Sequence, residues 1–372
     1  MFSYFFDIIL HMKNSKVKTV GILTSGGDAP GLNSAIRGLC EAGMNCYNMK
    51  FVGILNGYKG FEAGQCISIE KETLPQLLTL GGTFLGSTRE KPFKNKEKDS
   101  KTGLSAVDSI KKYYKKWKLD ALVVLGGNGS NTTAGLLSQE GLNVIGLPKT
   151  IDNDIVHTNY SFGFQTAVSI ASDAISKIHT TASSHSRVMV VEVMGHKAGW
   201  IGLHSGIASG ADVILLPEIP YDKKSVAKKI LENHKAGKKY SIVVVSEGAM
   251  NKEEAQLDKK AFKKERASMP CSMGERVAKE IEELTGLETR CTVLGHLQRA
   301  GEPLPYDRVM ATLFGASCAD YLARGDFGKI LVWQNDQIVG IPLLDVASQV
   351  KNVGLDEPLV KAAKSVGICF GD

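Results

Sequence analysis

The chain has 372 residues, 43% of them hydrophobic, which is enough for a large core and for two domains. Its net charge of +6 is mild, so it would attract anionic metabolites but does not indicate a nucleic-acid partner. The seven cysteines are scattered, odd in number and without a C-x-x-C pair, which is typical of reduced cytoplasmic thiols and argues against a disulfide framework or a zinc site.

The first eleven residues are apolar and aromatic, but they are too short to span a membrane. They also lack the basic start and the small-residue cleavage site of a signal peptide. Because Met12 opens a polar segment that leads into the first predicted strand, we expect translation to begin there and residues 1–11 to be a disordered extension. No later segment of the sequence is long and apolar enough for a membrane span.

Strand-like and helix-like patterns alternate along the rest of the chain. Buried strands are predicted at residues 19–24, 121–125, 144–145, 188–193, 213–216 and 242–245, and another begins at 292. Helices are predicted at residues 33–44, 167–179, 225–234 and 275–284. Strands of nearly continuous Val, Ile and Leu between helices predict an α/β fold with largely parallel sheets, covered on both faces.

Three lysine-rich segments need separate interpretation. Residues 91–101 and 252–264 look like surface insertions. Residues 111–118 interleave lysines with Tyr113, Tyr114 and Trp117. A nucleic-acid-binding patch is one interpretation of this pattern. We favour an amphipathic helix with an aromatic inner stripe, because the segment leads directly into the buried strand at 121.

A cation, a hydroxyl and two carboxylates follow the predicted strand at 144–145. They are Lys149, Thr150, Asp152 and Asp154. In open α/β sheets ligands bind at the carboxyl ends of the strands, where a carboxylate can accept a proton and a lysine can neutralise phosphate. A polar turn with helix-capping Asp and Asn explains these residues equally well when the segment is taken alone.

Two glycine-rich turns also follow predicted strands. Residues 24–31 (TSGGDAPG) follow the first strand, and residues 126–130 (GGNGS) follow the strand at 121. Neither is a dinucleotide fingerprint or a Walker lysine loop, and a plain tight turn explains either one alone. Two of them at strand ends favour a polyphosphate ligand, because glycines let backbone N–H groups approach phosphate oxygens.

Arginines stand beside Gly, His or Ser at several strand boundaries. Arg187 precedes the strand at 188–193, Arg290 precedes the strand predicted from 292, and Arg299 follows that strand. A lone arginine is usually a surface salt-bridge partner, but arginines can also clamp a phosphate through two hydrogen bonds. Their repetition at strand boundaries favours an anion site.

Together these segments resemble the 6-phosphofructokinase family. The resemblance rests on TSGGDAPGLNSAIR, GGNGS, PKTIDNDI, FGFQTA, SSHSRVMVVEVMGHKAGW, ETRCTVLGHLQRAG and PYDR, in the family's order and spacing from about Lys18 onward. It implies two Rossmann-like α/β domains with a cleft between them. It also implies transfer of the terminal phosphoryl group of a donor to the 1-hydroxyl of fructose 6-phosphate, with Mg²⁺, in glycolysis.

The resemblance implies roles for individual residues. Asp152 is expected to be the catalytic base, Thr150 to hold the transferring phosphate, and Asp154 to support the site and its magnesium waters, with Lys149 beside them. The donor is expected at Gly27, Arg89, Gly127, Asn128, Gly129 and Ser130. The sugar phosphate is expected at Thr150, Asp152, Arg187, Met194, Gly195, His196, Glu247, Arg290, His296 and Arg299.

In the family, the counterparts of Arg187 and Arg290 reach into a neighbouring subunit's site. A homo-oligomer, expected as a tetramer of two-fold-related subunits, is therefore implied. The phosphate-donor domain is expected at residues 12–162 and about 298–348, and the sugar-phosphate domain at 163–297 and about 349–372.

The sequence departs from the commonest family pattern at the donor. Asn128 stands where most relatives have a magnesium-binding aspartate, and an amide is a weaker partner for a hard cation. Gly129 is typical of ATP-dependent relatives, whereas Lys149 is typical of pyrophosphate-dependent ones and also occurs in many that use ATP. We favour ATP, because pyrophosphate-dependent relatives carry an aspartate at position 129 that would block a nucleotide, while an added lysine blocks nothing.

The effector site of simple bacterial relatives is also altered. Arg37, Lys238 and Lys239 match its basic residues, but Glu41, Gln65, His179 and Ala236 do not. Weak control by ADP or phosphoenolpyruvate is therefore expected.

Two rival functions remain beside the ATP-dependent kinase. They are a pyrophosphate-dependent phosphotransferase and a non-catalytic regulatory paralogue. The second has less support, because Asp152, Thr150, Arg187 and Arg290 are all present. A nicotinamide-dependent enzyme would need the dinucleotide fingerprint, which the sequence lacks.

Overall fold

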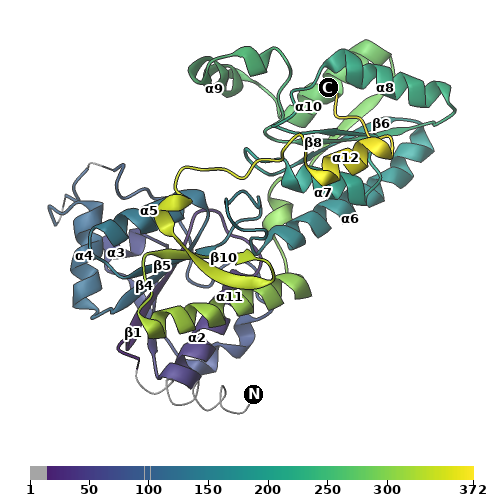
Figure 1. The fold of residues 1–372 in the computed structure, drawn as a ribbon. Helices are drawn as coiled ribbons and strands as arrows, with labels where there is room; N and C mark the ends of the chain where they lie inside the picture. Colours follow the sequence, from purple (N-terminus) through teal and green to yellow (C-terminus); the bar gives the residue numbers. More distant parts are fainter. Residues whose placement is uncertain (1–14, 96, 101) are drawn as a thin grey trace. The chain divides into compact units, whose positions relative to one another are not determined.

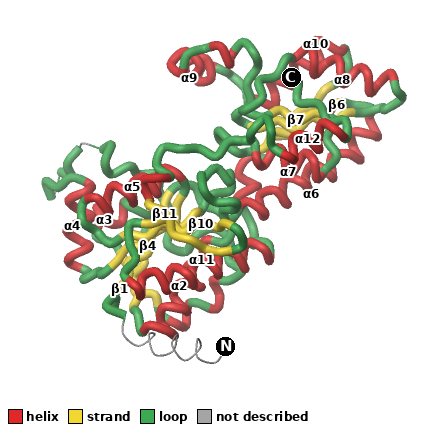
Figure 2. Tube along the Cα trace, viewed as in Figure 1, coloured by secondary structure: helices red, strands yellow, loops and turns green. Residues whose placement is uncertain are grey.

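A computed structural model of the chain describes residues 15–372 except 96 and 101, so the predicted extension and the start at Met12 lie outside the described residues. The described chain divides into two compact α/β units. The first comprises the residues up to Ile151, together with Ile155–Gln165 and Arg299–Gln349. The second comprises Asp152–Asp154, Thr166–Gln298 and Val350–Asp372. Figures 1 and 2 show strands flanked by helices in both units.

The first unit is built on one mixed sheet. Its strands are β1 (Thr19–Ser25), β2 (Lys50–Ile54), β3 (Cys66–Ile69), β4 (Ala121–Gly126), β5 (Val144–Pro148), β10 (Lys329–Gln334) and β11 (Gln337–Pro342). Among the described residues their order is β11-β10-β5-β4-β1-β2-β3. The central strands pair in parallel, and the edge strands β3 and β11 pair antiparallel with their neighbours.

Helices cover both faces of this sheet. They are α2 (Leu32–Tyr47), α3 (Lys59–Ala63), α4 (Ala106–Lys116), α5 (Asn128–Gln139) and α11 (Pro305–Arg324), with short 3₁₀ turns η1 (Lys71–Thr73), η2 (Pro75–Leu77) and η5 (Leu343–Asp345). α2 and α11 lie side by side (Figure 1), and glycines allow the contact. A Cβ on Gly38 would lie 2.6 Å from the Thr312 carbonyl oxygen, and one on Gly315 would lie 2.3 Å from that of Ala35.

The hydrophobic core explains why these strands are nearly continuous apolar runs. Every residue of β4 is buried, as expected for a central strand covered on both faces. Apolar residues of the sheet pack against α3, α4 and α5, and Tyr113, Tyr114 and Trp117 pack against the same cluster. The interpretation of 111–118 as an amphipathic helix with an aromatic inner stripe is therefore confirmed.

The second unit contains an all-parallel sheet in the order β7-β8-β6-β9. Its strands are β6 (Val188–Val193), β7 (Val213–Leu215), β8 (Ser241–Ser246) and β9 (Thr289–Val293). Its helices are α6 (Phe164–His185), α7 (Trp200–Ala208), α8 (Lys223–Lys235), α9 (Lys259–Ser268), α10 (Met273–Thr285) and α12 (Pro358–Ser365), with 3₁₀ turns η3 (Glu254–Gln256) and η4 (Gly295–Arg299). Side chains of α8 and α10 pack on the sheet in one apolar cluster. Within the residues that the structure describes, no helix is long and apolar enough to cross a membrane.

Two local predictions need correction. α6 continues past residue 179 to His185 because packing holds this Ser- and Thr-rich segment in the helix: His179 Nε2 lies 2.7 Å from the Ser209 carbonyl oxygen, and Ala182 is fully buried. β9 begins at Thr289, paired with Val188, so Arg290 lies inside the strand and not before it. The lysine-rich segment 252–264 lies at the surface for most of its length, as predicted, although Glu254 within it is only 2% exposed.

Candidate active site

Three loops leave the first sheet at one edge. In the strand register Ser25 is paired with Gly126, and Gly126 is paired with Pro148. Because β1, β4 and β5 are parallel, the segments that follow them all begin at the carboxyl edge of the sheet. Both glycine-rich turns and the segment beginning at Lys149 therefore meet there, as the α/β ligand-binding rule predicts.

The two helices that follow the glycine turns have no side-chain cap. α2 begins after Gly31, which has φ 93°, and α5 begins after Gly127. By contrast, α4 and α8 begin with the side chains of Ser105 and Asp222 accepting backbone N–H bonds. The N-termini of α2 and α5 thus present backbone N–H groups and positive dipole ends that suit an anion.

Side chains from the second and third loops converge on the first. Ser130 Oγ donates to Ser25 Oγ at 3.0 Å. The Lys149 ammonium, whose residue is only 3% exposed, donates to the carbonyl oxygen of Gly27. The buried lysine therefore supports the glycine turn and brings positive charge to the position where phosphate groups would lie.

A pocket of about 590 Å³ opens beside this turn, within the range of small-molecule sites. Its lining residues come from the first turn and from one later segment: Gly26, Gly27, Asp28, Thr83, Ser87, Thr88 and Arg89. The later segment is tied to the turn, because Ser87 Oγ donates to Gly26 O at 2.6 Å and Gly26 N donates to Thr88 O at 2.9 Å. The structure thus brings Gly27 and Arg89 to one pocket.

The backbone of Thr150 is held from the segment that follows it in the chain. Ser161 Oγ donates to the Thr150 carbonyl oxygen at 2.9 Å. Asp307, which is fully buried in α11, accepts from Gly163 N at 2.7 Å and from the Tyr160 hydroxyl. These contacts fix the path of the chain after β5 and hence the position of the Thr150 side chain.

One cation near Asp154 was not predicted from the sequence. Lys351 N donates to the Asp154 carbonyl oxygen at 2.8 Å, and the Lys351 ammonium lies 5.2 Å from the centroid of the Trp200 ring. Burial lowers the pKa of Lys351 to about 8, although the carboxylates of Asp154 and Glu357 oppose the shift. No motif marks this lysine, because it lies almost 200 positions from its neighbour in the chain.

The second unit gathers another set of predicted residues at the carboxyl edge of its own sheet. Met194, Glu247 and His296 follow β6, β8 and β9, which are paired in register. The Glu247 carboxylate accepts from His196 N at 2.8 Å, and the buried side chain of Gln298 accepts from Met194 N at 3.3 Å. Gln298 is a further residue of this edge that the sequence analysis did not single out.

Arg187 and Arg290 lie at the opposite edge of that sheet. Both pair with Glu288, Arg187 Nε at 2.8 Å and Arg290 Nη2 at 2.5 Å. The Arg187 hydrogen bond lowers the pKa of this exposed carboxylate. The six residues of β6 separate the two edges by about 20 Å, so the two arginines are not brought together with Glu247 and His296 in one chain.

Arg299 lies against the first glycine turn. Its Nη1 donates to the Asp28 carbonyl oxygen at 2.6 Å. A Cβ on Gly27 would lie 2.7 Å from the same Nη1, so only glycine leaves room for the guanidinium here. Within the first unit, Arg299 therefore contacts Asp28, one of the residues that line the pocket.

A buried lysine, a serine hydroxyl and open helix N-termini at the carboxyl edge of parallel strands are typical of α/β proteins that bind phosphate groups. The comparisons with known proteins are more specific. The family described as Phosphofructokinase matches residues 19–322. The chain belongs to the phosphofructokinase family.

A curated relative from Spirochaeta thermophila, named ATP-dependent 6-phosphofructokinase, is 52% identical over 365 residues, which cover 97% of this chain and 100% of the relative. The phosphofructokinase of Pichia pastoris, solved in the T-state, is 31% identical with a TM-score of 0.78 over 95% of this chain and 37% of its own. A pyrophosphate-dependent enzyme from Nitrosospira multiformis has a TM-score of 0.80 at 22% identity, over 95% of this chain and 93% of its own. The last similarity shows the fold alone.

Proposed function

We propose that this chain is an ATP-dependent 6-phosphofructokinase that phosphorylates the 1-hydroxyl of fructose 6-phosphate. The carrying observation is the convergence of Gly27, Ser130 and Lys149 at the carboxyl edge of β1, β4 and β5. The high identity to a relative named for this activity supports the same assignment. We propose a cytoplasmic location, which the scattered cysteines without a C-x-x-C pair support.

The chemistry follows from the side chains of the PKTIDND segment. Asp152 accepts the proton of the sugar 1-hydroxyl while the hydroxyl oxygen attacks the terminal phosphorus of ATP. The bond from that phosphorus to the bridging oxygen breaks, and ADP leaves with the electron pair. Lys149, Thr150 and the N–H groups at the start of α5 stabilise the charge that develops on the phosphoryl oxygens.

A divalent cation accompanies this chemistry in the family, and we propose Mg²⁺. The described residues contain no group of three or more His, Cys, Asp or Glu side chains that could hold a metal. That suits Mg²⁺, which is usually held by substrate phosphates and one or two carboxylates, with several waters. Asp152 and Asp154 would hold its waters and Asn128 would lie nearby, while the cation would neutralise phosphate charge.

The product identifies the activity. Incubating the full chain with fructose 6-phosphate, ATP and Mg²⁺ should give fructose 1,6-bisphosphate and ADP in equal amounts, measured by phosphorus NMR. A phosphate at another sugar position, or ADP without a bisphosphate, would refute the assignment.

The sugar phosphate is proposed to bind at the carboxyl edge of the second sheet. Met194, Gly195, His196, Glu247, His296 and Arg299 would hold it. Arg187 and Arg290 lie at the other edge and would complete the site of a neighbouring subunit. The proposed enzyme is therefore a homo-oligomer, with a tetramer as the expected form.

Shared sites predict complementation between inactive variants. Arg290→Gln and Asp152→Asn should each be nearly inactive, because one lacks the neighbour's clamp and the other lacks the base. Refolding an equal mixture should restore about one quarter of wild-type activity, because random pairing puts an intact base and an intact arginine together in that fraction of sites. A mixture no more active than its parents would contradict shared sites.

Regulation by ADP or phosphoenolpyruvate is expected to be weak. Of the basic residues that match the effector set, Arg37 is paired with Glu41 at 2.9 Å, and Lys238 is paired with the buried Asp212 at 2.6 Å. A phosphate would have to displace both carboxylates. Either effector should therefore change the fructose 6-phosphate concentration at half-saturation by less than about fivefold, which is the lower end of typical allosteric coupling.

Saturation curves with and without each effector test this expectation. Glu41→Gln provides the matched comparison, since it removes the competing carboxylate and should increase any effector response. A large shift in the unmodified enzyme would contradict the account.

The pyrophosphate-dependent reaction is the second candidate. It is favoured by Lys149, because a lysine at this position is typical of pyrophosphate-dependent relatives. However, its ammonium is bonded to the Gly27 carbonyl oxygen, so it has a supporting role with either donor. A Cβ at Gly129 would meet no described atom within 4 Å, which leaves the space beside the start of α5 open for a nucleotide. We therefore assign ATP as the donor.

A further inference from the structure

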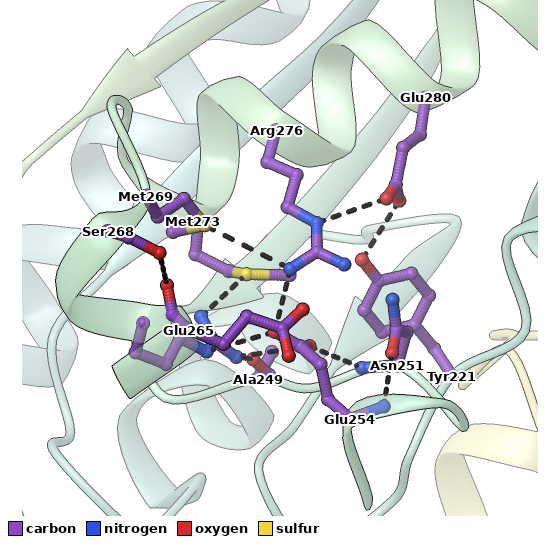
Figure 3. Close-up of polar contacts among 11 residues, drawn as sticks. Tyr221, Ala249, Asn251, Glu254, Glu265, Ser268, Met269, Met273, Arg276 and Glu280 are labelled. Carbon is purple, nitrogen blue, oxygen red and sulfur yellow. Dashed lines mark hydrogen bonds and ion pairs between the residues drawn. The ribbon is translucent and has the colours of Figure 1, made fainter. Parts of the chain in front are cut away.

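The loop that carries Glu247 is held by a buried network of ions. At its centre is the Glu254 carboxylate, 2% exposed, which lies 2.7 Å from Arg276 Nη1 and 3.2 Å from Arg266 Nε. It also accepts from Asn251 N at 3.0 Å. Figure 3 shows Arg276 directed toward this carboxylate, with Met269 and Met273 nearby. The network thus joins the loop after β8 to α9 and α10.

A second carboxylate completes the network on the α10 side. Glu280 accepts from Arg276 Nε at 3.1 Å and from the Tyr221 hydroxyl at 2.9 Å (Figure 3). Tyr221 N in turn donates to the Met250 carbonyl oxygen at 3.0 Å. Charge-assisted bonds of this kind are shorter and stronger than neutral ones, so they fix the backbone that they reach.

Arg266 is the residue through which α9 reaches the loop. α9, all of which the structure describes, buries none of its side chains, and four of its ten residues are lysines. Arg266 Nη2 donates to the Ala249 carbonyl oxygen, and Nη1 contacts Met273 Sδ at 3.0 Å. α9 is thus an exposed helix whose arginine is directed inward at a backbone group.

Ala249 is connected to the predicted sugar site by short backbone links. Ala249 N donates to Ser246 O, and Glu247 N donates to Val193 O, both at 2.8 Å. Between them, a Cβ on Gly248 would lie 2.1 Å from the carbonyl oxygen of His196, so the two loops are in close contact. A displacement of Ala249 would therefore move Glu247 and its hydrogen bond to His196 N.

We propose that Arg266 is a positioning residue for the sugar-phosphate site, which it serves by fixing the Ala249 carbonyl and thereby the carboxylate of Glu247. This inference rests on the proposed function, in which Glu247 helps to hold the sugar phosphate. It gives the lysine-rich helix α9 a specific role: α9 supplies the arginine, and its four lysines are exposed.

Arg266→Met removes the contact with little risk to folding. Glu254 keeps Arg276 and Asn251 N as partners, so no carboxylate is left alone. The KM for fructose 6-phosphate should rise about tenfold, while kcat and the KM for ATP stay within about twofold, because the lost contact affects uniform binding of the sugar. Arg266→Lys retains one donor and the charge, and should give an intermediate KM.

Lys264→Met is the matched control, since it removes the same charge from an exposed position of the same helix. Equal KM values for fructose 6-phosphate in wild type and Arg266→Met would overturn the inference, and so would an equal rise in the KM for ATP. If Arg266→Met does not fold, Arg266→Lys decides by the same criterion. If the wild-type enzyme itself did not phosphorylate fructose 6-phosphate, the proposed function would be refuted. Failure of the proposed function and failure of this inference are therefore distinguishable.

Discussion

Asp152→Asn is expected to lower kcat by about 10²- to 10⁴-fold, the usual contribution of a positioned general base. Asparagine has nearly the same shape, so substrates should still bind, and the KM values should change little. The loss arises because an amide cannot accept the proton of the attacking hydroxyl at neutral pH. Steady-state rates of fructose 1,6-bisphosphate formation measure the effect.

Asp356→Asn is the control for this variant, because it removes an equivalent charge from a side chain that is 98% exposed. It should retain full activity. If Asp152→Asn also retained full activity, the assignment of the base would be wrong and another carboxylate of the segment, such as Asp154, would have to replace it.

Gly129→Asp is expected to abolish most ATP-dependent activity without harming the fold. Gly129 lies in the first turn of α5, where an acidic side chain is favourable to the helix, and no described atom lies within 4 Å of its Cβ position. The new carboxylate would occupy the space of the nucleotide and repel its phosphates. Two like charges about 4 Å apart near a protein surface repel by about 4 kcal/mol, which corresponds to roughly 10³-fold in kcat/KM.

Gly129→Ala separates the two causes of that loss. A methyl group in open space should cost little, so alanine should retain most ATP-dependent activity while aspartate does not. An aspartate variant that used ATP at the wild-type rate would show that the donor does not lie beside the start of α5.

The fold was predictable where the sequence is locally consistent. β4 and β6 are Val-rich strands in which every residue is buried, and their predicted bounds agree with the structure to within one residue. Prediction failed where tertiary contacts override local signals. α6 continues through a Ser- and Thr-rich segment that resembles a helix end, and β9 is extended to Thr289 by its pairing with β6.

The site was predictable as a set of residue types, but its contacts were not. Local pattern identified Lys149 and the glycine turn, yet the bond between Lys149 and Gly27 joins residues 122 positions apart. Arg299 and Asp28 are 271 positions apart. Glu254 lies in a segment that composition marks as a solvated insertion and Arg266 follows it, and only the fold shows that their charges are directed toward each other.

Donor selection is the most direct test of the account, because it depends on Gly129 and Lys149 together. The purified full chain should be assayed with fructose 6-phosphate and Mg²⁺, with ATP or pyrophosphate as the only donor, at matched concentrations. The account predicts that kcat/KM for ATP exceeds that for pyrophosphate by at least about 10²-fold, the discrimination that a fitted site supplies. A rate supported by pyrophosphate and not by ATP would contradict it.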